Sequence, residues 1–347
     1  MNAPKEARAE PEARPESVRP EELRRTLWKR RFGALASTPA LWAGLLILGF
    51  YTFVGLFASV WYPGDPSYLP AHLVSGQVCP FPSGPTLSLW RLSLGAHPLG
   101  MTGGMGFDVL EGLVKGTPFD LILLSVVIFP SVTVGILIGT VAGARGGLVD
   151  DLLMLLTDVF LSVPEFILTL VALLFILPRV PPGQELIAFG LILNLVLWAP
   201  FARLVRARAR SVREMPFVEA ARASGAGRGR IIRRHILPNS VFPVLAQVPT
   251  TLATVLLLLG GLQFANLTSH PYACQGAVQP LFLPSPNFPE WTWVMANGAW
   301  AWLPSSSGIN PWWGYTFPAF WILLFGLGVT LTCDGLNRYL SRQTLSS

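Results

Sequence analysis

The sequence predicts an all-α integral membrane protein with six membrane-spanning helices. Of its 347 residues, 52% are hydrophobic and only 13% are charged, whereas a soluble domain carries about a quarter charged residues. Six apolar stretches are long enough to cross a bilayer, which takes roughly 20 residues per helix. The positive charges concentrate in the connections between these stretches, as is typical of membrane proteins.

The spans are expected at about residues 39–61, 119–143, 152–177, 186–204, 241–264 and 315–333. Prolines interrupt three of them, which membrane helices tolerate when neighbouring groups satisfy the freed carbonyls. The second span carries small residues four apart, at Gly135, Gly139 and Gly143. Such a stripe predicts that another helix approaches the second span closely.

The distribution of arginine and lysine predicts the topology. A basic triplet at residues 29–31 precedes the first span, and residues 203–234 carry ten arginines. The connection at 265–314 contains no lysine or arginine. The positive-inside bias therefore predicts a multi-pass protein of the cell membrane with both termini cytoplasmic. Since topology accounts for the +6 net charge, a nucleic-acid partner is not expected.

The chain is expected to divide into one membrane domain and two cytoplasmic tails. The N-terminal tail is charged and rich in proline and alanine, so it is predicted to be disordered. The predicted parts are the tail 1–38, the six-helix domain 39–340, the extracytoplasmic loops 62–117 and 266–315, the cytoplasmic loop 205–238 and the tail 341–347.

The second outer loop contains the aromatic run PEWTWVMANGAWAWLP. Tryptophans at this density favour a belt at the membrane–water interface, where one edge of the ring stays wet. Contact with a docking partner or with the mouth of a pathway is the alternative.

The cytoplasmic loop contains the stretch EAARASGAGRGRIIRRHILPN. Pro216 is well placed to open a helix, and residues 217–223 have an apolar side that can press into a groove on another protein. The helix is expected to break at three glycines: Gly225, Gly227 and Gly229. A second helix is expected from Ile231, with Pro238 at the beginning of the fifth span.

Two other interpretations of this loop exist. The arginines can hold the topology and bind anionic lipid headgroups, at about 1 kcal/mol each. A phosphate-binding loop is excluded, because no strand precedes the glycines and the chain contains no Gly-x-x-x-x-Gly-Lys-Ser/Thr pattern.

The loop resembles a known motif. Glu219-Ala220-Ala221, then Gly225, then Ile-Leu-Pro ending at Pro238 is similar to the EAA loop of binding-protein-dependent ABC importer permeases. The flanking WAPFARLVRARARSVREMPF and RHILPN resemble the peptide/nickel (DppC/OppC-like) subfamily, as do HPLG, FDVL, GGLVDDLLMLLTDVFLSVP and CDGLNRYL. The resemblance covers about residues 28–342.

The resemblance implies a type I importer permease (MetI-like) fold, whose loop helix docks in a cleft on an ATPase subunit. Glu219 is then expected to pair with a basic residue of the ATPase, with Phe217 and Val218 packing into the cleft and Gly225 making the turn. The expected coupling residues are Phe217, Val218, Glu219, Ala220, Ala221, Arg222, Ala223, Gly225 and Pro238.

The resemblance also implies a function in import of short peptides by alternating access. The expected partners are a second, homologous permease subunit in a heterodimer, two ATPase subunits that bind ATP and Mg²⁺, and an external substrate-binding protein. No catalytic residue, metal or cofactor is expected in this chain. Nickel chelates or oligosaccharides are alternative substrates, and a stand-alone secondary carrier is an alternative of another class.

Three polar residues within the spans are candidates for the translocation path: Asp158, Glu165 and Asn194. Buried acids in a membrane usually face a cavity or a partner, and a spacing of seven puts Asp158 and Glu165 on nearly one helix face. Asp158 matches the family pattern, which favours a structural pairing there. A helix–helix hydrogen bond is favoured for Asn194.

Cysteines provide a further hypothesis. Cys79 and Cys274 lie in the two outer loops, and Cys333 lies at the inner end of the sixth span. Two cysteines in an oxidising compartment can form a disulfide, if their Cα atoms lie within about 7 Å. Cys333 is expected to be a small buried hydrophobic residue.

Overall fold

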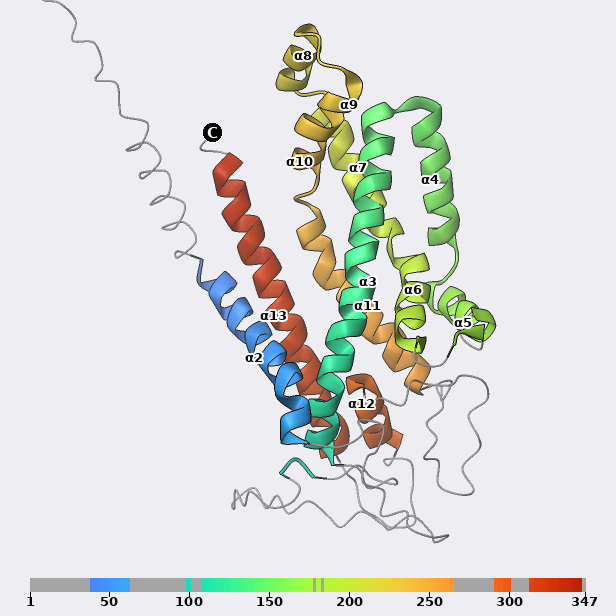
Figure 1. Ribbon diagram of the computed structural model, residues 1–347, viewed down its shortest axis with the longest axis vertical. Coiled ribbons are helices and arrows are strands. Elements are labelled where there is room, and N and C mark those ends of the chain that lie inside the picture. The colour runs from blue at the N-terminus through green and yellow to red at the C-terminus, as the bar shows by residue number, and fades with distance from the viewer. Residues whose placement is uncertain are drawn as a thin grey trace, which may run out of the picture. The chain divides into compact units, whose positions relative to one another are not determined.

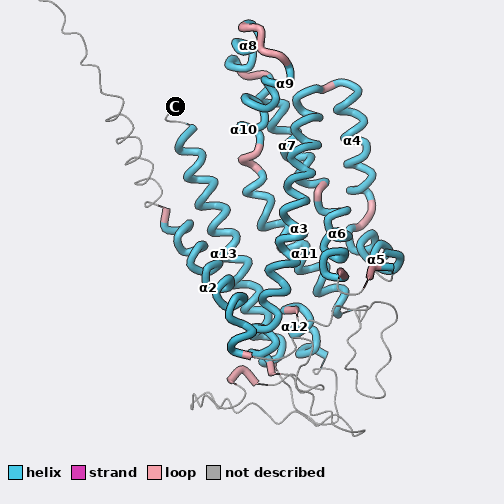
Figure 2. Tube along the Cα trace, in the orientation of Figure 1, coloured by secondary structure: helices cyan, strands magenta, loops and turns pink. Residues whose placement is uncertain are grey.

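A computed structural model describes residues 38–62, 98–100, 108–176, 179–181, 184–264, 290–300 and 312–344. These residues form helices and connections, and no strand occurs among them (Figure 2). Most of the N-terminal tail, much of the first outer loop, and both Cys79 and Cys274 lie outside the described residues, so the predictions for them stay predictions.

Four described helices are each long and apolar enough to cross a membrane: α2 (Pro39–Trp61), α3 (Val109–Arg145), α11 (Val244–Phe264) and α13 (Trp313–Thr344) (Figure 1). Two further pairs of helices pass the same test together but are bent at a short break. Counting each bent pair as one span gives six spans, which is the predicted number.

The third predicted span is two helices, α4 (Gly147–Ser162) and α5 (Glu165–Ile176), with an angle of 87° between them. The break falls at Pro164. A residue before proline is pushed toward extended backbone, and Val163 has φ −94° and ψ 132°. A proline that was expected to be tolerated inside a helix therefore separates two helices.

The fourth predicted span is also two helices, α6 (Glu185–Leu197) and α7 (Ala199–Arg213), with an angle of 44° between them. Trp198 lies at the junction, and Pro200 lies in the first turn of α7. Proline is compatible with this place because the first N–H groups of a helix have no intrahelical acceptor.

Helix α3 begins ten residues before the predicted start of the second span. The carboxylate of Asp108 caps this end, because it accepts a hydrogen bond of 2.8 Å from the backbone N–H of Glu111. Glu111 also forms an ion pair of 2.7 Å with Lys115, one turn further along the helix.

The glycine stripe of α3 packs directly against α7, which confirms the prediction of close helix packing. A Cβ added at Gly139 would lie 2.4 Å from the carbonyl oxygen of Ala202. Similar clashes with α7 of 2.6 Å or less arise across the stripe, at Gly135, Gly139 and Gly143. The two backbones therefore approach as closely as glycine permits.

Helix α12 (Trp291–Trp300) lies within the predicted second outer loop. Trp291 and Trp293 belong to the core, and neither has an edge in water. The rings of Tyr51 and Phe325 contact the Trp291 ring at centroid distances of 5.5 and 5.1 Å. For these two tryptophans the predicted interfacial belt is wrong, because α12 packs against α3, α11 and α13.

Candidate functional site

The chain between α7 and α11 forms four short helical segments at one end of the bundle, opposite α12 (Figure 1). We call residues 205–238 the EAA loop. The segments are α8 (Pro216–Ala223), α9 (Arg228–Ile231), the π-helix η2 (Ile232–Ile236) and α10 (Leu237–Ser240).

Helix α8 has the bounds that the sequence predicts. Pro216 occupies its first turn. At the other end, Gly225 has φ +80°, and its N–H donates to the Arg222 carbonyl oxygen while the N–H of Ala226 donates to that of Ala221. These two bonds and the left-handed residue form a Schellman cap. Gly225 therefore makes the turn that ends α8.

The other two glycines of the block do not break a helix. Gly227 has φ −65° and caps the start of α9, and Gly229 lies inside α9. The second helix therefore begins at Arg228, three residues earlier than expected. Because one left-handed glycine already reverses the chain, the remaining two have backbone angles that other residues adopt.

Val218 ties α8 to the rest of the loop. Its side chain has no exposed area, and it packs in a small cluster with Ala209 and Val212 of α7 and with Ile231 and Ile236. The expectation that Val218 packs into a partner protein is therefore wrong, since its surface is already covered by its own chain. Val218 instead fixes the position of α8 on α7.

The opposite face of α8 is open. Phe217 exposes 41% of its surface, and its ring lies 6.2 Å from that of His235. Glu219 is exposed, and no described side chain forms an ion pair with it. The other exposed residues of this helix are Pro216, Ala220, Arg222 and Ala223, whereas Ala221 is partly buried against the Val218 cluster.

The segment that leads to α11 is irregular. The N–H of Leu237 donates to the carbonyl oxygen of Ile232, five residues earlier, which is a π-type bond. Pro238 follows directly and lacks an N–H to continue the α-helical pattern. Pro238 lies in α10 and not at the start of the fifth span as expected, since α11 begins at Val244 after a second proline, Pro243.

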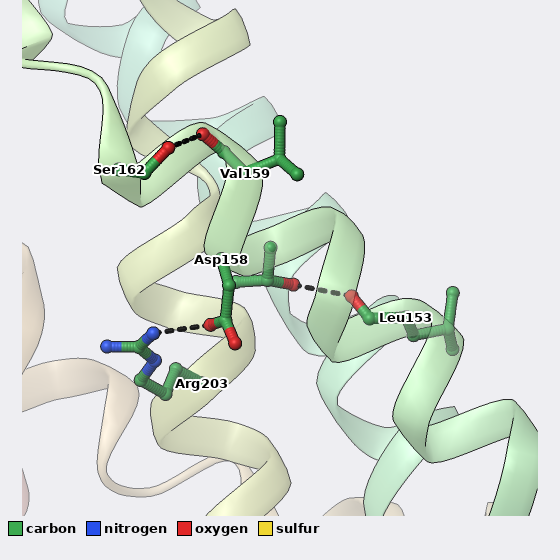
Figure 3. Close-up of polar contacts among 6 residues, drawn as sticks. Leu153, Asp158, Val159, Ser162 and Arg203 are labelled. Atoms are coloured by element: carbon green, nitrogen blue, oxygen red, sulfur yellow. Dashed lines mark hydrogen bonds and ion pairs between the residues drawn. The ribbon is translucent and has the colours of Figure 1, made fainter.

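Helix α7 is also tied to α4 by two ion pairs. The guanidinium of Arg206 donates from Nε and Nη2 to the two carboxylate oxygens of Asp150, at 2.6 and 2.8 Å. Arg203 of α7 pairs with Asp158 of α4 at 2.5 Å (Figure 3). Sequence reasoning missed Asp150 and Arg206. Their pairing depends on the sharp turn at Gly146 and Gly147, both of which have positive φ.

The three candidate path residues do not form one site. Asp158 is 57% exposed and bound to Arg203, as the structural interpretation favoured. Glu165 begins α5 beyond the 87° break, so the expectation that it shares a helix face with Asp158 is wrong. The Asn194 amide of α6 donates to the Val127 carbonyl and the Ser131 hydroxyl of α3, at 3.1 and 3.0 Å, which is a helix–helix contact.

Most arginines of the loop are exposed: Arg208, Arg210, Arg222, Arg228, Arg230, Arg233 and Arg234. Lipid binding by these side chains stays open. Within the described part of the chain, no three His, Cys, Asp or Glu residues form a group that could hold a metal ion. Cys333 is buried in α13.

Comparison with known proteins decides the family. Residues 135–269, from the glycine stripe to just beyond α11, match the family described as binding-protein-dependent transport system inner membrane component. The chain is 31% identical over 242 residues to a probable D,D-dipeptide transport system permease protein of Escherichia coli, covering 70% of this chain and 72% of that relative. The chain belongs to this family.

Other members extend the match over more of the chain. A di/tripeptide transport system permease protein of Pseudomonas aeruginosa is 30% identical, with 85% of each chain covered. A dipeptide transport system permease protein of Alkalihalophilus pseudofirmus is 27% identical, with 89% of this chain and 88% of the relative covered. Membership makes this protein a multi-pass membrane component of a transport system that includes a binding protein.

Proposed function

We propose that this chain is one of two permease subunits of an ATP-driven importer of short peptides, and that α8 couples the membrane bundle to an ATPase subunit. The arginine-rich end is then cytoplasmic, with both termini on that side. An external binding protein delivers the peptide, and two partner ATPases bind ATP and Mg²⁺. The peptide substrate is proposed because relatives of this chain are named as D,D-dipeptide, dipeptide and di/tripeptide permeases.

The observation that carries the coupling role is the arrangement of α8, with one covered face and one open face. Val218 attaches the helix to α7, while Phe217 and Glu219 remain open to a partner. A short helix with an exposed aromatic ring beside a carboxylate suits docking in a groove that has an apolar floor and a basic rim. Glu219 then meets a basic residue of the ATPase.

The packing behind α8 supports transmission of movement. Helix α7 contacts the backbone of α3 at the glycine stripe and is bound to α4 through Asp150. A displacement of α8 by a closing ATPase dimer would therefore move α7, α3 and α4 together. Closely packed elements shift as units because they cannot deform continuously. In this proposal, that shift drives the change between inward-open and outward-open states.

The test uses the importer complex assembled with its ATPases and binding protein. Glu219→Lys is expected to reduce both co-purification of the ATPases and stimulation of ATP hydrolysis by peptide-loaded binding protein. Asp151→Lys is the matched control, because it makes the same charge change at an exposed residue of α4. If Glu219→Lys retains assembly and stimulation at the level of Asp151→Lys, α8 is not the coupling element.

A stand-alone carrier is tested by the same preparation. Peptide uptake into vesicles that contain only this chain and its homologous partner, without ATPases, would contradict the importer proposal. Uptake that requires both ATP and the loaded binding protein supports it. Competition by nickel chelates or oligosaccharides for the binding protein, with no competition by peptides, would move the proposal to another substrate class.

A further inference from the structure

The start of α12 is attached to α3 by three hydrogen bonds from one residue. The backbone N–H of Trp291 donates to Asp120 Oδ2 at 2.9 Å, and its indole Nε1 donates to the Leu113 carbonyl and the Thr117 hydroxyl, at 3.2 Å each. Asp120 therefore acts as an N-terminal cap for a helix that is distant in sequence.

A second carboxyl group lies next to this cap. Glu290 directly precedes Trp291, and its side chain is a neighbour of Asp120. Asp120 has no exposed area and Glu290 only 4%. The amide of Gln263, near the end of α11, donates to Glu290 Oε1. Residues of α3, α11 and α12 thus meet at two buried acids.

No basic side chain among the described residues neutralises this pair. On α3, the nearest charged residues in sequence are Glu111 and Lys115, which are paired with each other at 2.7 Å. On α2, Tyr51 directs its hydroxyl to the Trp321 carbonyl of α13. Helices α11 and α12 contain no other titratable residue. On α13, Tyr315 lies two residues from Trp313, whereas Cys333, Asp334, Arg338 and Tyr339 lie in the far half of the helix. On α5, which packs against α11, the titratable residue is Glu165.

One oxygen of each acid is left without a hydrogen-bond partner: Asp120 Oδ1 and Glu290 Oε2. The Thr292 hydroxyl lies close to Glu290 but outside hydrogen-bond geometry, and its proximity lowers the pKa of Glu290 less than burial raises it. Two ionised carboxylates can only accept hydrogen bonds, and burying both charges without a cation carries a large free-energy cost. A single proton between the two orphan oxygens removes one charge and satisfies both atoms.

We propose that Asp120 and Glu290 share one proton and form a proton-binding site that fastens α12 to α3 and α11. The site goes beyond the proposed transport function and does not depend on it. Burial raises the pKa of Glu290 above its ordinary value, in the direction that the geometry requires. Since the connection between α11 and α13 is extracytoplasmic in the proposed topology, protons of that compartment would be the ligand.

The sign of the pH effect follows from linkage. Because the folded pair holds its proton more tightly than the unfolded chain, this stabilisation is fully present at low pH. It is lost as the pH rises through the pKa of the folded pair. The midpoint of thermal unfolding is therefore expected to fall by roughly 2–4 °C for each pH unit between the ordinary carboxyl pKa and the pKa of the folded pair, and to stay level above it.

The direct test is infrared spectroscopy of the assembled complex at neutral pH. A protonated carboxylic acid has a carbonyl stretching band that is separate from the carboxylate bands. Asp120→Asn and Glu290→Gln are each expected to remove this band, because each leaves a single carboxylate beside a neutral amide of nearly the same shape. Asp334→Asn, at an exposed acid of α13, is the matched control and is expected to retain it.

Thermal unfolding provides the second readout. Both amide variants are expected to unfold at nearly the same temperature across the range between the ordinary carboxyl pKa and the pKa of the folded pair, whereas the unmodified chain and Asp334→Asn lose stability as the pH rises through this range. A spectrum in which neither amide variant removes an acid band would overturn the proposal. So would a wild-type stability that follows sodium or calcium concentration and not pH, since a metal cation would then balance the charges.

Discussion

Arg206 of α7 and Asp150 of α4 form a two-point ion pair, in which Nε and Nη2 of the guanidinium each donate to a different carboxylate oxygen. Asp150 is buried, and Arg206 is half-buried in the part of α7 that precedes α8. The pair therefore joins the helix that leads into α8 to the helix that follows the glycine stripe.

Replacement of this arginine by lysine is expected to weaken the junction although the charge is kept. Lysine provides a single point of contact where the guanidinium makes two. We expect Arg206→Lys to lower the stability of the assembled complex by about 1–3 kcal/mol, measured by thermal unfolding. Arg208→Lys is the control, because Arg208 is exposed on the same helix. Equal stability of the two variants would show that the two-point contact contributes nothing.

The glycine stripe yields a steric prediction. Gly139→Ala would place a methyl group 2.4 Å from the Ala202 carbonyl oxygen, so α3 and α7 must separate. Overpacking typically costs about 1–3 kcal/mol, and here backbone and not a side chain must move. We expect loss of assembled complex in size-exclusion chromatography after mild heating. Gly49→Ala in α2 meets nothing within 4 Å, and it should behave like the unmodified chain.

Alanine substitutions at Gly225 and Gly227 distinguish the effect of backbone strain from that of steric contact. A Cβ at either residue meets nothing within 4 Å, but only Gly225 has a positive φ. Gly225→Ala is expected to cost about 1–2 kcal/mol and to reduce ATPase stimulation, because α8 loses its cap. Gly227→Ala should have no such effect. Gly225→Asn should restore part of the stimulation, since asparagine tolerates the left-handed region. Identical behaviour of both alanine variants would contradict the assigned turn.

Two adjacent residues of α8 should have opposite phenotypes. Val218→Ala removes two buried methyl groups and is expected to destabilise this subunit by about 1–3 kcal/mol, as seen in thermal unfolding without the ATPases. Phe217→Ala, at a half-exposed ring, should leave that stability nearly unchanged and weaken ATPase binding instead. If Phe217→Ala destabilises the isolated subunit as much as Val218→Ala does, the ring belongs to the core of the loop and not to a docking face.

Much of the architecture could be predicted because it depends on local signals. The first span is found at the predicted residues 39–61, and α8 begins at Pro216 and ends before Gly225 as expected. The small-residue stripe indicated a close helix contact that the structure places against α7. Hydrophobicity, proline at a helix start and glycine at its end act over a few residues, so the sequence alone reveals them.

The predictions that are wrong concern contacts between segments that are distant in the sequence. A proline inside an apolar run can kink a helix or end it. The sequence does not show which of the two happens at Pro164, where the two helices form an angle of 87°. Nothing near Val218 in the sequence indicates that α7 and η2 cover it. By composition alone, the tryptophans of α12 are typical of a membrane interface, but Trp291 has its hydrogen-bond partners on α3, more than 170 residues away.

The central claim is that the open face of α8 contacts an ATPase subunit. Cross-linking from Ala220→Cys on this face in the assembled complex tests it directly, with the unmodified chain as background for its own Cys79, Cys274 and Cys333. We predict a cross-link to the ATPase from Ala220→Cys and much less from Ala207→Cys, an equally small exposed residue on α7. No cross-link from Ala220→Cys, or an equal one from both variants, would contradict the claim that α8 is the coupling helix.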